Sequence, residues 1–299
     1  MSILTKGLYT ALITPFTKDK KIDFNSLEKL LNFQISNNLD GVVLCGTTGE
    51  GATLSSIEKL EIAEFSSNII KNKIKIILNC GTNNTQVSAN LAKDASKLNI
   101  DGLLAITPYY NKASDKGMFL HFAEIAKNTN LPIILYNVPS RTGIDLKDSI
   151  IGELATNFKN IVGIKDATGD LSRISSLRLK VENNFFLFSG EDATSLAFNE
   201  SGGDGVISVA SNIVPNLMLK LQNLSLKDDL NTTKEEKLHL QKLIYKISRI
   251  LFMEVNPIPV KYLLFLMGLC ENEYRLPLCS PSNHVVQEIE KLYQELKFY

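Results

Sequence analysis

Short apolar runs alternate along the chain with longer segments whose apolar residues recur at helical spacing. The amphipathic segments predict helices, among them Ser26–Ser36, Ser55–Ile70, Thr85–Leu98 and Lys116–Asn128. Strands separated by helix-sized segments indicate βαβ units and a parallel sheet. The apolar runs predict eight strands, at Leu8–Phe16, Gly41–Cys45, Ile74–Cys80, Gly102–Thr107, Pro132–Val138, Ile161–Ala167, Phe185–Ser189 and Gly205–Val209.

This α/β pattern predicts a closed (β/α)8 TIM barrel over residues 1–226, within one domain that spans residues 1–299. A doubly wound open sheet is the second choice, because no dinucleotide fingerprint opens the first unit. Residues 227–299 predict three further helices, with Pro257 and Pro259 at the start of the middle one. We expect these helices to form a C-terminal extension of the barrel.

Composition favours a soluble enzyme over a nucleic-acid-binding or membrane protein. Lys and Arg number 32 and Asp and Glu number 32, so the formal net charge is zero and no basic footprint for nucleic acid is visible. The apolar stretch Tyr262–Leu269 is too short to span a bilayer, and residues 1–7 lack a signal-peptide pattern. Four scattered cysteines indicate a reducing compartment, so we expect a cytoplasmic protein.

The sixth predicted strand carries a lysine near its end, where barrels of this kind place functional residues. With period two, Lys165 shares a face with Ile161 and Gly163, points into the barrel, and has space beneath it at Gly163. Val162 and Ile164 are then expected to pack under the helices.

Burial of Lys165 would lower the pKa of its amine, because desolvation favours the neutral form. A neutral amine can attack a ketone and form an imine, which serves as an electron sink. A lysine at a strand end can also reach solvent or pair with Asp166, and this strand alone leaves both interpretations open.

Other predicted strand ends carry polar side chains. Thr47 and Thr48 lie in a glycine-rich turn that can hold a carboxylate, although such a turn is more often only a connection. Tyr136 can relay a proton, and Arg141 can bind a carboxylate with its planar fork. Tyr110 belongs to a tyrosine pair of the kind common in cores and interfaces.

The three histidines are isolated from one another and have no metal-ligand spacing, so we expect no metal site. They are His121, His239 and His284. We expect no cofactor either.

Taken together, these segments resemble the pyruvate-dependent lyase and aldolase family, which includes N-acetylneuraminate lyase. The likeness covers nearly the whole chain. It runs from Thr10–Phe16 through the strand-end motifs to Gly203–Ser208, and continues into Asn256–Tyr262 and Arg275–Leu278.

The resemblance implies a reaction that begins with an imine between Lys165 and pyruvate. Tyr136 would shuttle protons and connect through Thr47 to Tyr110, which in this family reaches in from a neighbouring subunit. The resulting enamine would attack the aldehyde of aspartate semialdehyde, a step of lysine and diaminopimelate biosynthesis. The same resemblance implies a homotetramer built from tight dimers, with these two small molecules as substrates.

The resemblance also implies how the substrates bind. Thr47 and Thr48 would hold the pyruvate carboxylate, and the backbone near Gly190 and Ile207 would complete the pocket. Arg141 would bind the carboxylate of the second substrate, which suits a small amino-acid aldehyde better than a long sugar.

Two other functions are weighed against this one. A related aldolase would act on N-acetylneuraminate or a 2-keto-3-deoxy sugar acid. A non-catalytic protein would bind a small keto acid, but binding alone does not require a lysine amine inside a barrel.

Lysine-regulated members of the family usually have a histidine after the Gly-Thr-Thr-Gly-Glu loop and a glutamate on the next helix. This chain has Ser56, Lys59 and Val87 in the corresponding stretches. We therefore expect lysine to inhibit this protein weakly or not at all.

Overall fold

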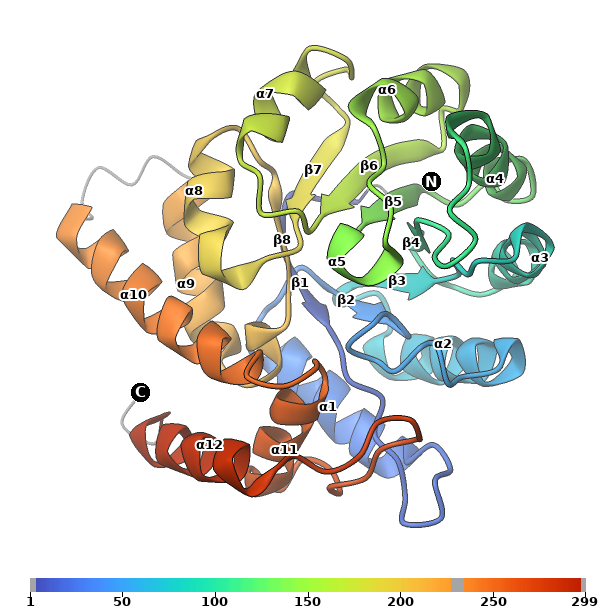
Figure 1. Ribbon diagram of the computed structural model, residues 1–299. Helices are drawn as coiled ribbons and strands as arrows, with labels where there is room; N and C mark the ends of the chain where they lie inside the picture. Colours follow the sequence, from blue (N-terminus) through green and yellow to red (C-terminus); the bar gives the residue numbers. More distant parts are fainter. Residues whose placement is uncertain (1–3, 227–233, 297–299) are drawn as a thin grey trace.

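The computed structural model describes residues 4–226 and 234–296. Its parallel strands close into a barrel in chain order, each paired with the next and the last paired with the first (Figure 1). This closed order confirms the predicted barrel and excludes the open sheet. The strands are β1 (Gly7–Ala11), β2 (Gly41–Leu44), β3 (Lys75–Asn79), β4 (Gly102–Ile106), β5 (Ile133–Asn137), β6 (Ile161–Asp166), β7 (Phe186–Ser189) and β8 (Gly205–Ser208).

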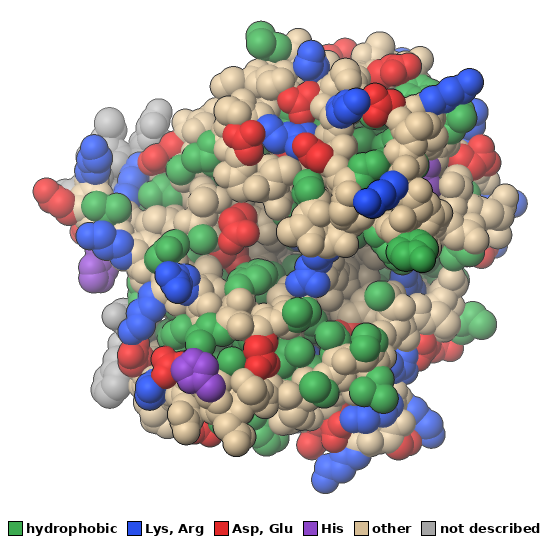
Figure 2. Space-filling model, in the orientation of Figure 1, with side chains coloured by type: hydrophobic (Ala, Val, Ile, Leu, Met, Phe, Trp, Pro, Cys, Tyr) green, Lys and Arg blue, Asp and Glu red, His purple; other side chains and the backbone are tan. Residues whose placement is uncertain are grey.

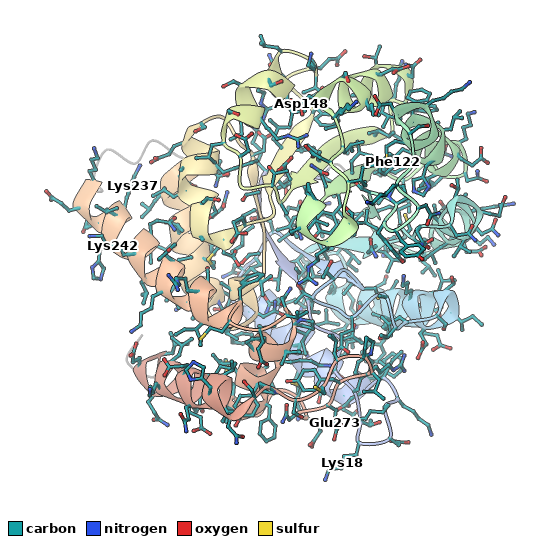
Figure 3. All side chains as sticks on the ribbon, in the orientation of Figure 1. Lys18, Phe122, Asp148, Lys237, Lys242 and Glu273 are labelled. Carbon is teal, nitrogen blue, oxygen red and sulfur yellow. The ribbon has the colours of Figure 1, made fainter. Side chains whose placement is uncertain are left out.

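Helices surround the barrel and bury their apolar faces against its outside (Figure 1). Phe122 of the fourth helix is an example, and it is buried (Figure 3). The helices between strands are α1 (Phe24–Ser36), α2 (Ser56–Ile70), α3 (Thr85–Ala95), α4 (Asp115–Lys127), α5 (Pro139–Thr142), α6 (Asp148–Asn157), α7 (Ser172–Arg178) and α8 (Ser195–Glu200), with short 3-10 turns η1 (Asp192–Thr194) and η2 (Ala210–Asn212) before α9 (Pro215–Leu226).

The first predicted strand, Leu8–Phe16, is longer than β1, which ends at Ala11. The rest of this apolar run leaves the sheet but stays buried. The ring of Phe16 lies under two cations of the C-terminal region, with Lys261 Nζ 4.2 Å and Arg275 Cζ 4.6 Å from its centroid. The run is therefore apolar because it packs under the helical extension, which a strand pattern cannot reveal.

Strand β6 departs from strict alternation because its pairing with β5 shifts after Ile161. Ile161 therefore packs with Ile164 in the cluster under the helices, and Val162 packs against the barrel interior. This corrects the predicted faces of Ile161 and Val162. Beyond the shift the alternation resumes, and Lys165 faces the barrel interior as predicted.

In the part of the chain that the structure describes, three helices follow the barrel, as predicted, and cover one side of it (Figure 1). They are α10 (Lys234–Leu251), α11 (Ile258–Leu266) and α12 (Asn283–Leu296). Pro257 is the N-cap of α11 and Pro259 lies in its first turn. The predicted boundary at residues 226–227 adjoins residues 227–233, which lie outside the described part of the chain. Within that described part, every helix is too short or too polar to cross a membrane.

Candidate active site

Lys165 and Tyr136 lie side by side at the carboxyl end of the barrel. They are register partners on β6 and β5, and both side chains face the interior. Lys165 is 6 % exposed and Tyr136 is 5 % exposed. The amine Nζ lies 4.4 Å from the centroid of the tyrosine ring. This geometry places an amine against a phenol, away from bulk water.

Two glycines allow the backbone to approach closely around Lys165. A Cβ on Gly190 would lie 3.1 Å from Cε of Lys165 and 2.7 Å from Cβ of Ala167, so only glycine fits there. A Cβ on Gly163 would lie 2.8 Å from the carbonyl oxygen of Phe186. The predicted space at Gly163 is therefore filled by the neighbouring strand. Gly190, in contrast, is brought directly against the lysine.

The turn after β2 places the two predicted threonines at the same end of the barrel. Gly51 is required in this turn, since a Cβ there would lie 2.0 Å from the carbonyl oxygen of Cys45. Thr48 is buried and accepts a hydrogen bond from Nδ2 of Asn256 at 2.9 Å. Thr47 is half-buried and lines a cavity. In the described residues, no hydrogen bond joins Thr47 to Tyr136.

The cavity has a volume of about 530 Å3, and Thr47, Tyr109, Arg141 and Asn256 are among its lining residues. Figure 2 shows that this face of the molecule is hollowed near its centre, with charged side chains of both signs around the hollow. Arg141 is exposed and donates from Nη2 to the carbonyl oxygen of Asn256 at 3.1 Å. A cation at the cavity suits an anionic substrate.

Two further predicted residues take different places. Ile207 of β8 is fully buried among the interior side chains of the barrel. Tyr110 is 88 % exposed, with a left-handed backbone φ of 70°. Among the described residues of this chain, no hydrogen bond or ring contact joins Tyr110 to Tyr136, which is buried. The chain by itself therefore assembles Lys165 and Tyr136, and leaves Tyr110 at the surface.

Asn256 has a role at the site that the sequence interpretation missed. Its side chain donates to Thr48 and its backbone accepts from Arg141, although it lies in the helical extension, between α10 and α11. The two residues that it contacts are those predicted to bind the carboxylates of the two substrates. The proline-containing motif that starts at Asn256 marked this segment in the sequence, but no local pattern indicates which residues Asn256 contacts.

A fully buried ion pair also joins the extension to the turn after β2 that carries Thr47 and Thr48, the threonine turn. Lys261 of α11 and Glu50 both have 0 % side-chain exposure, and Glu50 also accepts a hydrogen bond from the backbone N–H of Arg275 at 3.1 Å. Burial lowers the pKa of Lys261, and the negative charge of Glu50 opposes that effect. The sequence feature that could have indicated this pair is Lys261 itself, a single charged residue within the apolar run of α11.

Two carboxyl groups after β7 add to the electrostatics around Lys165. Burial raises the pKa of Asp192, whereas hydrogen bonds from the backbone N–H groups of Ala210 and Val209 and the positive charge of Lys165 oppose this rise. Burial also raises the pKa of Glu191, and the charge of Asp192 adds to that effect. The sequence interpretation did not single out these carboxyl groups.

His, Cys, Asp and Glu side chains nowhere gather into a group of three that could hold a metal ion, as far as the described residues extend. The four cysteines are free thiols, and Cys279 is the exposed one. The groups that the structure brings to the carboxyl end of the barrel are the amine, phenol, hydroxyl, guanidinium and carboxyl groups described above.

The chain has close relatives of known name. It is 42% identical over 294 residues to a 4-hydroxy-tetrahydrodipicolinate synthase of Aliarcobacter butzleri, covering 98% of this chain and 97% of that protein. The crystal structure of a dihydrodipicolinate synthase from Aquifex aeolicus matches with a TM-score of 0.94 and 34% identity, over 98% of each chain. A structure described as a monomeric dihydrodipicolinate synthase variant matches with a TM-score of 0.92 and 36% identity, over 98% of this chain and 97% of that one.

A sequence model of one family matches almost the entire chain. The match extends over residues 4–296, which include all eight strands and the three helices of the extension. Sequence, fold and relatives thus agree over the same residues. The chain belongs to the dihydrodipicolinate synthetase family.

Proposed function

We propose that this protein condenses pyruvate with aspartate 4-semialdehyde to give 4-hydroxy-tetrahydrodipicolinate, a step of lysine and diaminopimelate biosynthesis. The observation that carries the proposal is the buried pair of Lys165 and Tyr136, with the amine 4.4 Å from the ring centroid. Relatives named 4-hydroxy-tetrahydrodipicolinate synthase, which match nearly the full chain, support the substrates. They also favour this reaction over that of a sugar-acid aldolase.

The reaction begins when Nζ of Lys165 attacks the ketone carbon of pyruvate and water leaves, which gives an imine. Tyr136, whose ring lies against this amine, transfers the protons of that step. The imine withdraws electrons, so a methyl proton is lost and an enamine forms. The enamine carbon attacks the aldehyde, and the amine of the semialdehyde then displaces Lys165 from the imine carbon and closes the ring.

The polar groups around the pair would orient the two substrates. Thr47 and Thr48 bind the pyruvate carboxylate, and the backbone at Gly190 and Ile207 completes the pocket. Arg141 lines the cavity and binds the carboxylate of the semialdehyde.

We also propose a homotetramer of tight dimers in which Tyr110 reaches the site of a neighbouring subunit and joins the proton relay through Thr47. Its 88 % exposure in a single chain supports this placement. The barrel and the extension act as one domain, since Asn256 and the pair of Lys261 with Glu50 tie them together. The cytoplasm is the expected compartment, and the free thiols are consistent with it.

The test treats the protein with pyruvate and borohydride, then locates the reduced adduct by mass spectrometry of its peptides. We expect one pyruvate adduct, on Lys165. A Lys165→Met variant should carry none. Lys59→Met, which removes another buried lysine, should keep it. A folded wild-type protein without an adduct would contradict the imine mechanism.

A second assay tests the substrates. The wild-type protein is given pyruvate with aspartate semialdehyde, and separately N-acetylneuraminate. We expect turnover of the first pair and little cleavage of the sugar acid. The reverse preference, in a protein that forms the adduct, would show that the mechanism is right and the second substrate is wrong.

A further inference from the structure

The residues that follow Tyr136 and Lys165 form a second pair. Asn137 and Asp166 are the next register partners on β5 and β6. Because side chains alternate along a strand, these two face the helices while Tyr136 and Lys165 face the barrel interior. Any group that holds Asn137 and Asp166 therefore also holds the backbone from which the reactive pair projects.

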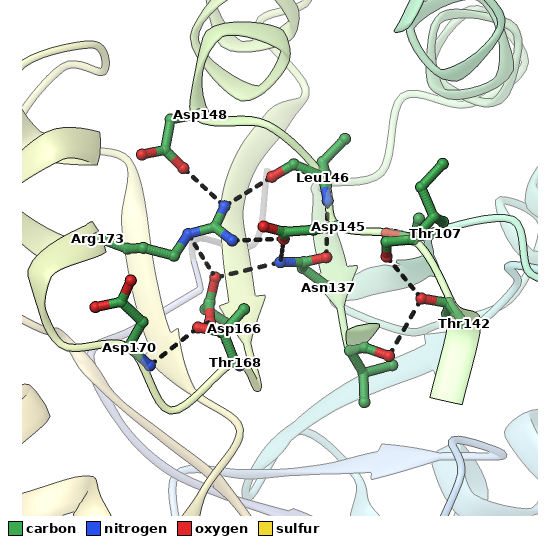
Figure 4. Close-up of polar contacts among 12 residues, drawn as sticks. Thr107, Asn137, Thr142, Asp145, Leu146, Asp148, Asp166, Thr168, Asp170 and Arg173 are labelled. Atoms are coloured by element: carbon green, nitrogen blue, oxygen red, sulfur yellow. Dashed lines mark hydrogen bonds and ion pairs between the residues drawn. The ribbon is translucent and has the colours of Figure 1, made fainter. Parts of the chain in front are cut away.

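Asp166 is held from several directions, as Figure 4 shows. Its Oδ1 accepts hydrogen bonds from the backbone N–H and the hydroxyl of Thr168, the former at 2.8 Å. Its Oδ2 lies 3.5 Å from Nδ2 of Asn137. Backbone bonds continue the connection, from Ala167 N–H to Asn137 O at 2.9 Å and from Gly190 N–H to Asp166 O at 2.7 Å. The ends of β5, β6 and β7 thus meet at Asp166, and the residue after β7 contacts it through the backbone.

Arg173 of α7 contacts three carboxylates around this point (Figure 4). Its Nη1 donates to Asp145 at 2.6 Å, and its Nη2 donates to Asp148 and to the carbonyl oxygen of Leu146, each at 2.7 Å. Its Nε lies 3.3 Å from Oδ2 of Asp166. One guanidinium therefore joins the end of β6 to the segment that precedes α6.

Arg173 and the three carboxylates that it contacts form a polar cluster. The end of β5 joins this cluster through Asn137. Its Nδ2 donates to Asp145 at 2.6 Å, and its Oδ1 accepts from the backbone N–H of Leu146 at 3.0 Å. The segment held in this way follows α5, the helix that carries Arg141. The cluster thus contacts both strands of the reactive pair and the connection to the predicted carboxylate-binding arginine.

Charge and burial make Arg173 the central group. Its side chain is 10 % exposed, and those of Asp166 and Asp148 are 6 % and 18 % exposed. Burial alone would lower the pKa of Arg173, but the negative charges of Asp166, Asp145 and Asp148 raise it overall. Removing the guanidinium would leave the buried Asp166 carboxylate without this cation, directly beside Lys165 in the chain.

We propose that Arg173 is a positioning residue for the reaction, which holds the ends of β5 and β6 so that Tyr136 and Lys165 stay side by side. This inference rests on the proposed function, because it assigns Arg173 to the imine-forming pair. Arg173 itself lies on the helix side and acts through Asp166 and Asn137. Misplacement of reacting groups by about 1 Å can slow an enzyme on the order of 100-fold.

Helix α7 offers a matched control at the opposite end of the barrel. Arg178 donates to the carbonyl oxygens of Phe185 at 2.7 Å and Gly202 at 2.9 Å, and forms an ion pair with Asp204. These partners precede β7 and β8 and lie at the amino ends of the strands. Arg178 thus resembles Arg173 in its contacts but is separated from the reactive pair.

The experiment compares Arg173→Met, Arg173→Lys and Arg178→Met with the wild-type protein. Thermal unfolding, kcat, KM for pyruvate and the rate of borohydride-trapped adduct formation on Lys165 are measured for each. We expect Arg173→Met to lower kcat and the trapping rate about 10- to 100-fold. Arg178→Met should lower kcat less than about threefold at a similar loss of Tm. KM for pyruvate should change little in either, because the threonine turn is not part of the cluster.

Arg173→Lys keeps a positive charge but lacks the planar fork that reaches several carboxylates at once. We expect it to fold with nearly the wild-type Tm and to recover part, but not all, of the kcat lost in Arg173→Met. If Arg173→Lys folds and both its kcat and its trapping rate equal those of the wild-type protein, the positioning role is wrong. If the wild-type protein itself forms no adduct, the result contradicts the proposed function, and with it the positioning role that rests on it.

Discussion

His121 of α4 is a buried imidazole outside the active site. It is 4 % exposed, and its Nδ1 lies 2.9 Å from Oγ1 of Thr85. Its buried Nε2 has no hydrogen-bond partner among the described residues. Burial lowers the pKa of His121 from its ordinary value of 6.5 to about 4. This residue is therefore neutral in the folded protein at pH values where an unfolded chain would already be protonated.

The His121 pKa predicts a loss of stability in mild acid. Between the unfolded pKa of 6.5 and the folded pKa of about 4, the unfolded chain binds more protons, so stability falls as the pH falls. From pH 7 to pH 5 this group should remove about 2 kcal/mol from the free energy of unfolding. Urea unfolding at the two pH values measures the loss.

His121→Gln serves as the control, because glutamine does not titrate. Its free energy of unfolding should fall by about 2 kcal/mol less than that of the wild-type protein over the same pH interval. An equal fall in both proteins would assign the acid sensitivity to other groups.

At the scale of elements, the connection of α11 to the β2–α2 turn depends on one buried ion pair. Lys261 and Glu50 are both fully buried, and the lysine Nζ also lies 5.1 Å from the ring centroid of Tyr274. The same turn carries Thr47 and Thr48. The extension therefore contributes to the position of the proposed pyruvate-binding groups as well as to stability.

Breaking the Lys261–Glu50 pair from one side should be costly. Lys261→Met leaves a buried carboxylate without its partner, and we expect a loss of roughly 3–5 kcal/mol in the free energy of unfolding. The double variant Lys261→Met, Glu50→Gln should recover much of that loss, because no charge remains buried. Urea unfolding of the wild-type protein, of the single variants Lys261→Met and Glu50→Gln, and of the double variant gives the coupling energy. A double variant as unstable as Lys261→Met would argue against an unpaired charge as the cause.

At the scale of the whole molecule, the exposed Tyr110 is relevant to assembly. If it completes the site of a neighbouring subunit, two inactive or weakly active variants should complement each other. We expect Tyr110→Phe to lower turnover without unfolding the protein, and Lys165→Met to have none. Subunits with Tyr110→Phe keep the amine, and subunits with Lys165→Met keep the tyrosine.

Equal co-expression of the two variants should therefore produce mixed dimers with one complete site. Random pairing predicts about a quarter of the wild-type activity per subunit. Steady-state turnover of the mixture, with the oligomeric state measured by sedimentation, checks this. Activity no higher than the sum of the separate variants would place Tyr110 outside the relay.

The cavity offers a test of the expectation about inhibition by lysine. Ser56, Lys59 and Val87 are among its lining residues, and the Lys59 side chain is buried. Burial lowers the pKa of Lys59. An amine that entered this part of the cavity would meet the amine of Lys59.

We therefore expect free lysine to inhibit turnover weakly or not at all. The measurement is a titration of the condensation reaction with lysine at fixed substrate concentrations. Inhibition by lysine at concentrations below about 1 mM corresponds to a binding free energy more favourable than roughly −4 kcal/mol. Such inhibition would show that these substitutions do not prevent binding.

Short apolar runs predicted all eight strands, and apolar residues at helical spacing predicted helices α1 to α4, because the spacing of apolar residues records which parts of an element are buried. The capping box of Ser55 and Glu58 at the start of α2 also depends on local sequence, and the structure contains both of its hydrogen bonds. The rule that barrel enzymes react at strand ends then selected Lys165 and Tyr136, which the fold places side by side.

Tertiary structure decided what depends on distant partners. The shift after Ile161 reversed the faces of two residues, since register is a property of two strands together. Asn256 lies 208 residues from Thr48, and no local pattern connects them. The same holds for Arg173, whose four partners come from two other segments. Periodicity determines which face of an element is buried, whereas closure of the barrel and packing of the extension determine which residues meet there.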